Sequence, residues 1–146
     1  MTLLRRLDHI AILVRSTDAA LEYYEGELGL PLHSSEEITS PPVRLTYLDS
    51  GNAFLQLVEP LDPSSALGAW LDEHGEGLHH ICFGVDDVAA AAKALSNGAS
   101  PTLGSGRGRA SAFVETSASH GVRIECTQFL SDEDVDLAAG WLPPGG

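Results

Sequence analysis

The same order of apolar and polar residues occurs twice along the chain, at residues 7–14 and 78–85. Each segment starts with leucine, has a histidine two residues later, and continues with mostly apolar residues to a final valine. A short, mostly apolar run of this kind is typical of a buried β-strand. Because the two segments superimpose without a gap, the pattern predicts an internal repeat.

Each copy continues with elements of the same kind. Short polar residues suited to N-capping follow each strand, and an alanine-containing helical stretch then runs to a glycine, Gly29 or Gly98. Strand-like runs with a central polar residue follow near the end of each copy, at residues 54–58 and 123–127. The chain is therefore predicted to contain two strand-helix-strands units.

The segment between the copies, residues 62–74, has an N-capping aspartate, a proline at the first helical position and an apolar stripe. It is predicted to be a linker helix between module one, at about 5–60, and module two, at about 76–130. Residues 131–146 form an acidic tail. Each half is too small to bury a comfortable core alone, so we expect both to pair within one domain, residues 1–146.

Composition and charge narrow the class of partner. The chain is 43% hydrophobic and has a mean hydropathy of +0.01, without the roughly 20 uninterrupted apolar residues that a membrane span needs. Arg5, Arg6 and Asp8 stand where a signal peptide would be apolar, so we expect a cytoplasmic protein. A formal charge of −13 disfavours nucleic acid and anionic membranes, which leaves a small molecule. Cys82 and Cys126 lack zinc-finger or CxxC spacing and are expected to be reduced thiols.

Strand parity separates a packing face from a candidate site face. In the first copy His9 shares its face with Ala11, and in the second copy His80 shares its face with Cys82. The opposite faces carry bulky apolar residues that suit packing under a helix. Small residues beside a histidine leave room for a cavity, so we place the candidate site on the histidine face.

Two oxygen-bearing side chains, Gln56 and Glu125, also occupy equivalent places in the two copies. If the copies pair about a pseudo-twofold axis, these residues and both histidines converge on one point. Two imidazole nitrogens, one amide oxygen and one carboxylate suit a divalent metal. A single anionic ligand leaves positive charge on such an ion, which attracts an anionic oxygen donor. The pattern predicts an open, catalytic metal site.

At these residues the sequence resembles the vicinal oxygen chelate superfamily, and within it the methylmalonyl-CoA epimerases. The resemblance covers most of residues 5–129 and is carried by the runs 54–60, 65–71 and 75–83. It implies an α+β fold of two paired βαβββ modules around an open cavity with a divalent ion of cobalt, manganese, nickel, zinc or iron. It also implies a homodimer. The metal ligands that it implies are His9, Gln56, His80 and Glu125.

The reaction that the resemblance implies is removal of the proton next to the thioester carbonyl of an acyl-CoA-like or other anionic substrate. A metal-stabilised enolate would form, and Glu125 is the candidate base. Several epimerases carry a second, opposing glutamate at the position that aligns with Leu45, and leucine cannot relay a proton. Glu36 or Glu37 is an alternative source of a carboxylate, although two solvated loop acids are the simpler interpretation. The chain also has residues 114–116, Val-Glu-Thr, where the epimerases usually read leucine-histidine-proline.

The glycine-rich run 104–110 carries two arginines, Arg107 and Arg109, that are candidates for substrate binding. Their guanidinium groups suit a phosphate or a carboxylate. The run lacks the spacing of a P-loop or a Rossmann fingerprint, and a plain hairpin connection is an equal alternative.

Three other functions stay open on the sequence. A glyoxalase I-like lyase or isomerase of the same fold is favoured by Leu45. An iron-dependent extradiol-type dioxygenase would use both histidines and Glu125 as a facial triad. A non-catalytic drug-binding protein would use the cavity without metal.

Overall fold

The computed structural model describes residues 3–98 and 100–130, so the predicted acidic tail, 131–146, lies outside the described residues. Strands and helices alternate along this part of the chain in two similar series. The first series is β1 (Leu4–Leu13), α1 (Thr17–Leu21), η1 (Glu22–Glu27), β2 (Leu32–Thr39), β3 (Pro42–Asp49) and β4 (Phe54–Pro60). After α2 (Ala66–His74), the second series is β5 (Gly77–Val85), α3 (Val88–Leu95), β6 (Thr102–Gly106), β7 (Arg109–Phe113) and β8 (Ile124–Gln128).

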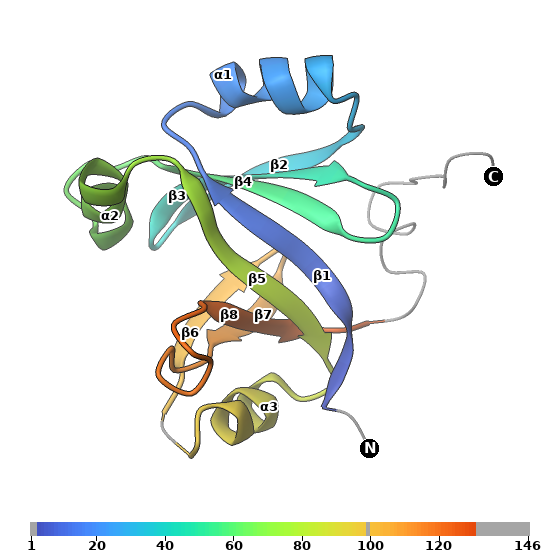
Figure 1. The fold of residues 1–146 in the computed structure, drawn as a ribbon, viewed down its shortest axis with the longest axis vertical. Helices are drawn as coiled ribbons and strands as arrows, with labels where there is room; N and C mark the ends of the chain where they lie inside the picture. The colour runs from blue at the N-terminus through green and yellow to red at the C-terminus, as the bar shows by residue number, and fades with distance from the viewer. Residues whose placement is uncertain (1–2, 99, 131–146) are drawn as a thin grey trace.

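These strands form one mixed sheet in the order β2-β3-β4-β1-β5-β8-β7-β6. Within each half the first strand pairs in parallel with the last, β1 with β4 and β5 with β8. The two first strands, β1 and β5, pair antiparallel and join the halves at the centre of the sheet. Figure 1 shows the sheet curling on both sides of this junction. The predicted α+β fold of two paired βαβββ units is confirmed.

One helix covers the outer face of each half, as the capping signals predict. Ser16 caps α1 by accepting a hydrogen bond from the Ala19 backbone N–H, and Asp87 caps α3 in the same way through Ala90. The helix α1 and the π-helical segment η1 pack on an outer cluster around Leu57, and α3 packs on a separate cluster in the second half. Because both helices lie outside, the inner face between the halves is left for a site (Figure 1).

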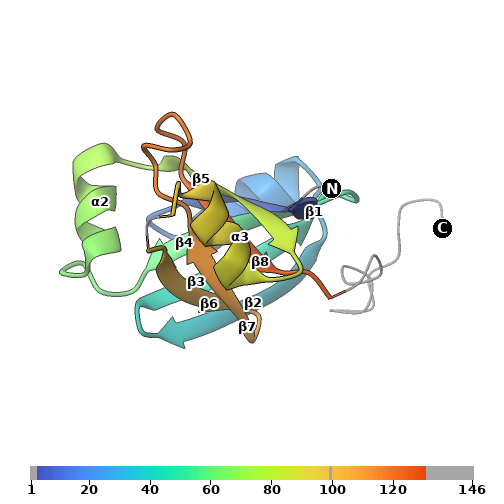
Figure 2. The ribbon, with the colours of Figure 1, turned by 90° about the horizontal axis from the view of Figure 1, so that it is seen from below.

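The linker helix α2 begins at Ala66, later than the predicted start at residue 62. The reason is that Asp62 caps a turn of its own, in which its carboxylate accepts from the Ser64 backbone N–H and hydroxyl. Ser65 is the true N-cap and accepts from the Gly68 N–H. In Figure 2 the helix stands beside the sheet at the open end of the curl. No helix in the described part of the chain is long and apolar enough to span a membrane.

The inner face of the first half has its own core. Its buried members are all apolar or aromatic and come from β1, β3 and β4: Ala11, Leu13, Val43, Leu45, Tyr47, Phe54 and Val58. Leu67 and Leu71 of α2 pack against this cluster from the open side. The two cysteines, which are free and fully buried, lie on opposite faces of the sheet, since Cys126 joins the cluster under α3 and Cys82 shares the inner face with His80.

Candidate metal centre and cavity

The strand register places the four predicted ligands in two neighbouring rows across the centre of the sheet. In one row Ala11 of β1 lies between Gln56 of β4 and His80 of β5. In the other row Cys82 of β5 lies between His9 of β1 and Glu125 of β8. Each row therefore has a small side chain at its centre and a candidate ligand on each side. Because neighbouring strands are about 4.8 Å apart, the longer side chains can meet above the small ones.

Three of these side chains meet closely on the inner face. The Nε2 atoms of His9 and His80 are 3.2 Å apart. Glu125 Oε1 lies 3.3 Å from His9 Nε2 and 3.2 Å from His80 Nε2. All three residues are buried, with exposed fractions between 2% and 8%. The structure thus brings together two imidazole nitrogens and one carboxylate oxygen, a group that could hold a metal ion.

The electrostatics of this group favour an ionised Glu125. Burial alone would raise the pKa of Glu125, but hydrogen bonds with His80 and His9 outweigh it and hold the pKa well below its usual range. Burial would lower the pKa of His9, and its hydrogen bonds with Asp8 and Glu125 raise that pKa instead. The Glu125 carboxylate is therefore charged and available as an oxygen ligand for a cation.

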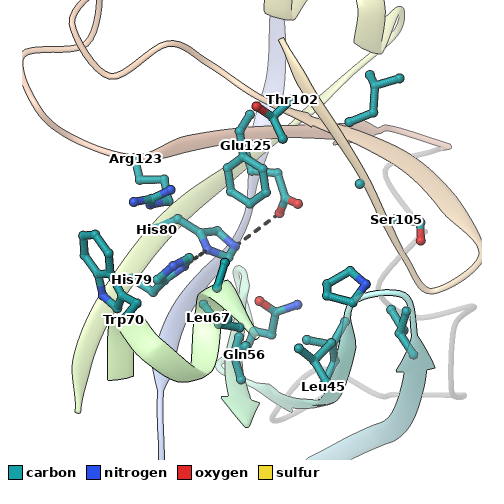
Figure 3. Close-up of a pocket in the computed structure, with 18 residues that line it drawn as sticks. Leu45, Gln56, Leu67, Trp70, His79, His80, Thr102, Ser105, Arg123 and Glu125 are labelled. Atoms are coloured by element: carbon teal, nitrogen blue, oxygen red, sulfur yellow. Dashed lines mark hydrogen bonds and ion pairs between the residues drawn. The ribbon is translucent and has the colours of Figure 1, made fainter. Parts of the chain in front are cut away.

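Gln56 is the candidate for the fourth donor, and its hydrogen bonds fit that role. Its Nε2 donates to the Tyr47 hydroxyl at 2.9 Å, which sets the orientation of the amide. Its Oε1 is buried and has no hydrogen-bond partner among the described residues. A buried carbonyl oxygen without a donor is unfavourable unless something else binds it. In Figure 3 Gln56 and Glu125 lie on opposite sides of the His80 ring, facing the same cavity. This donor set of two nitrogens and two oxygens fits a divalent cation.

Residues next to the histidines orient their rings. Asp8 Oδ2 lies 2.6 Å from His9 Nδ1, which places the proton on Nδ1 and leaves Nε2 as the ligand atom. His79 Nδ1 lies 2.8 Å from His80 Nδ1. Burial and the charges of His80 and Arg123 lower the pKa of His79 to about 3, so this ring is neutral and can accept the His80 Nδ1 proton. A cation bound at this point would take the place of the Nε2 protons that face Glu125, and both rings would present Nε2 to it.

The β6–β7 hairpin reaches this centre through Arg107. This residue sits in the turn with a φ of 53°, and its backbone N–H donates to Glu36 Oε1 at 2.7 Å. Its guanidinium Nη2 donates to Asp8 Oδ2 at 2.5 Å. The same guanidinium lies 4.8 Å from the centroid of the Tyr47 ring. Arg107 is thus part of a buried ion pair that supports Asp8 and, through it, His9.

This placement differs from the predicted substrate contacts. Of the described residues that line the cavity beside the metal centre, neither Arg107 nor Arg109 is one. Arg107 is turned inward because the buried Asp8 carboxylate attracts it. Glu36 lies in β2 rather than in a loop, faces the same side as Leu45 in the β2–β3 register, and uses its carboxylate on the hairpin. Glu37 is exposed.

Replacing Arg107 by glutamine is expected to lower the free energy of unfolding by about 3 kcal/mol. The change removes one partner of a buried ion pair, whose side chains are 9% and 6% exposed, and leaves the Asp8 carboxylate with His9 alone. Glutamine is unbranched at Cβ, like arginine. Urea denaturation followed by circular dichroism measures the change.

The control for this prediction is Arg5→Gln, which breaks the exposed ion pair with Asp86. Those side chains are 55% and 67% exposed, so a loss below about 1 kcal/mol is expected. Equal losses of unfolding free energy in the two variants would mean that the buried ion pair stabilises the fold no more than the exposed one.

A cavity of about 430 Å³ opens beside the candidate metal centre. Apolar side chains from both halves and from α2 form much of its wall, and Gln56, His80 and Glu125 lie at its base. Leu45 lines the cavity, as its alignment with the family glutamate predicts. Among the described residues that line it, Glu125 is the one carboxylate and Arg123 the one arginine. Arg123 was not among the predicted site residues, although strand parity already puts it on the face of Glu125.

Comparison with known proteins gives matches over most of the chain. A family model described as the Glyoxalase/Bleomycin resistance protein/Dioxygenase superfamily matches residues 8–114. YqjC, an uncharacterized protein of Bacillus subtilis, is 32% identical over 136 residues, which are 89% of this chain and 96% of that protein.

Two further matches carry the name of an enzyme. The ethylmalonyl-CoA/methylmalonyl-CoA epimerase of Cereibacter sphaeroides is 31% identical over 102 residues, which are 69% of this chain and 76% of that protein. A solved structure of a Streptomyces coelicolor methylmalonyl-CoA epimerase variant, in complex with 2-nitronate-propionyl-CoA, matches with a TM-score of 0.77 and 34% identity. That match covers 88% of this chain and 99% of the other.

Proposed function

Because this chain belongs to the glyoxalase/bleomycin resistance protein/dioxygenase superfamily, we propose that it is a divalent-metal-dependent epimerase or isomerase that removes the proton next to a thioester carbonyl. The observation that carries the proposal is the convergence of His9, His80 and Glu125 beside the unpaired Gln56 oxygen, at the base of a cavity. The relatives named as methylmalonyl-CoA epimerases support an acyl-CoA thioester as the substrate class.

The four ligands would leave a bound divalent ion with open positions for substrate. Glu125 is the one anionic ligand of the set, so a divalent ion keeps net positive charge. When bound, the ion supplies Lewis-acid stabilisation of the negative charge that develops on the substrate oxygens. Asp8 and His79 keep both imidazole Nε2 atoms directed at that position. We include cobalt, manganese, nickel, zinc and iron as candidate ions, since each is compatible with nitrogen and oxygen donors.

Glu125 is the residue to which we assign proton removal. It is the one carboxylate among the described residues that line the cavity, and it lies at the base, where the thioester end of a substrate would meet the metal ligands. The wall around Leu45 and Phe113 is apolar, which favours the removal of water from the reacting carbon when a substrate fills the cavity. A base in this position acts from one side of the cavity.

A second candidate function follows because the cavity has a base on one side alone among the described residues. Epimerisation through two bases needs an acid on the opposite face of the carbon. Leu45 occupies the cavity wall, and Glu36 is engaged with the Arg107 backbone N–H. One base alone favours an isomerase or lyase that removes and returns a proton on the same face, as in the glyoxalase-like branch.

Proton exchange at C2 tests the proposed function and separates it from the second candidate. The metal-reconstituted protein is incubated in deuterated buffer with (2R)- and (2S)-methylmalonyl-CoA separately, and NMR follows loss of the C2 proton. A two-base epimerase is expected to exchange both epimers and interconvert them. One-face chemistry is expected to exchange one epimer without forming the other.

The controls concern the metal and the alternative reactions. A chelator-treated sample is expected to lose exchange, and re-addition of Mn²⁺ or Co²⁺ is expected to restore it. Exchange that persists at zero metal content, or no exchange at full metal occupancy, would overturn the proposed function. Oxygen consumption in the presence of Fe²⁺ and a catechol would point instead to the dioxygenase.

A further inference from the structure

The guanidinium of Arg123 lies at the rim of the metal cavity, where a second hollow begins. Arg123 directly precedes β8 and lines both the 430 Å³ cavity and a neighbouring hollow of about 300 Å³. It lies over the ring of Trp70 in α2, 4.9 Å from the ring centroid. In Figure 3 it stands beside Trp70 and His79, on the same side of the cavity as Glu125. A strong, permanent cation thus faces the space beside the metal ligands.

Arg123 differs from the other arginines for which the structure gives ion pairs. Arg5 pairs with Asp86, Arg44 with Asp18 and Arg107 with Asp8. Among the described residues Arg123 has no carboxylate partner, and its side chain contacts the Trp70 ring. The chain has 21 acidic residues against 8 lysines and arginines, yet Glu125 is the one carboxylate among the described residues that line the cavity with Arg123. The guanidinium is left with hydrogen-bond donors for a ligand.

The Trp70 contact prepares this group for binding an anion. An aromatic ring attracts the guanidinium and restricts its motion, which reduces the entropy that a ligand must overcome to order it. A guanidinium whose face is covered keeps its N–H donors at the edge, where a carboxylate can accept two of them. Because Trp70 belongs to α2 and Arg123 to the second half, the pair is fixed by elements from two parts of the fold.

The position along the strand indicates which anion would fit. Arg123 and Glu125 are two residues apart on extended backbone, which separates their Cα atoms by about 7 Å on the same face. A carbon held at Glu125 for proton removal therefore has its other substituents within reach of Arg123. The phosphates of coenzyme A lie at the far end of the pantetheine arm, well beyond this distance. A carboxylate on the acyl group itself is the anion that matches.

Building on the proposed function, we propose that Arg123 binds a free carboxylate on the acyl group and makes the site selective for malonyl-type thioesters over neutral acyl thioesters. A charge-assisted hydrogen bond of this kind corresponds to a change in affinity of about tenfold or more. Lysine in this position would keep the charge but lose the two parallel donors and most of the contact with Trp70.

Binding measurements on the metal-loaded protein test the proposal. Calorimetry gives the dissociation constants of methylmalonyl-CoA and propionyl-CoA for the wild type, Arg123→Leu and Arg123→Lys. We expect Arg123→Leu to weaken methylmalonyl-CoA about tenfold and propionyl-CoA less than about twofold, with Arg123→Lys in between. Arg15→Leu, which removes the same charge from an exposed position that does not line the cavity, is expected to change neither constant. Equal weakening of both thioesters by Arg123→Leu would overturn the proposal.

A third ligand distinguishes the acyl carboxylate from the phosphates of coenzyme A. Methylmalonyl-pantetheine keeps the carboxylate and lacks the phosphates, so the tenfold effect of Arg123→Leu is expected to persist with it. Loss of the effect would assign Arg123 to the phosphates and overturn the carboxylate proposal. Calorimetry reports the dissociation constant whether or not the C2 proton is exchanged. Selectivity without C2 exchange would therefore refute the proposed function alone, and exchange without selectivity would refute the role of Arg123 alone.

Discussion

Alanine in place of His80 is expected to abolish stoichiometric binding of a divalent metal while the chain stays folded. The substitution removes one of two imidazole nitrogens from a centre whose three close ligand atoms lie within 4.8 Å of one another. Glu125 keeps its contact with His9 at 3.3 Å, so no buried carboxylate is left without a partner. The imidazole borders the cavity, so its removal enlarges a space that already exists. Calorimetric titration with Mn²⁺ or Co²⁺ and thermal denaturation measure the two parts of this expectation.

His74→Ala is the matched control for this prediction. His74 is an exposed histidine at the end of α2, and it does not line the cavity. Its variant is expected to bind one metal ion per chain with unchanged affinity. Full metal occupancy in the His80 variant would show that the ligand assignment is wrong.

Glutamine in place of Glu125 is expected to keep the metal and to slow C2 proton exchange by about a hundredfold to ten thousandfold. The amide oxygen can remain a ligand, as the unpaired oxygen of Gln56 is proposed to be on the other side of the centre. What the amide cannot do is accept the substrate proton, because it has no basic form near neutral pH. The comparison therefore separates the ligand role of residue 125 from its role as a base.

Metal content must be measured in the same samples for this result to be interpreted. Deuterium exchange is normalised to bound metal, and the expected loss is in exchange per metal ion. The alternative substitution to alanine would remove ligand and base together. Unchanged exchange per bound metal in the glutamine variant would remove Glu125 from proton transfer.

The placement of the four candidate ligands follows from the sequence further than the surrounding contacts do. The repeat of the segments at 7–14 and 78–85 predicts that His9 and His80 are equivalent, and strand parity predicts their common face. The structure adds the reason that they meet, which is the antiparallel register of β1 and β5 with Ala11 and Cys82 between the ligands. Local periodicity carries this information because the ligands belong to the central strands themselves.

Contacts between distant loops could not be derived in the same way. The ion pair of Asp8 and Arg107 joins residues 99 positions apart and depends on a hairpin turn in which Arg107 has a positive φ. The glycine-rich run does not predict which way the Arg107 side chain points. The pattern predicts Asp62 as the N-cap of the linker helix, but Asp62 forms a turn of its own and the helix begins at Ala66. The sequence predicts that Arg123 lies on the same strand face as Glu125. It does not predict that Arg123 has no acidic partner among the described residues. Such features depend on which side chains the folded chain brings together.

Each of the two rows across the sheet contains one candidate ligand from each half of the fold. His9 and Gln56 come from the first series of elements, and His80 and Glu125 from the second, so each half carries one nitrogen and one oxygen. Neither half could hold a divalent ion with two ligands alone. An ion bound here would clamp the two halves across the seam between β1 and β5. A chelator would then remove two things at once: the Lewis acid of the reaction and a cross-link between the halves of the fold.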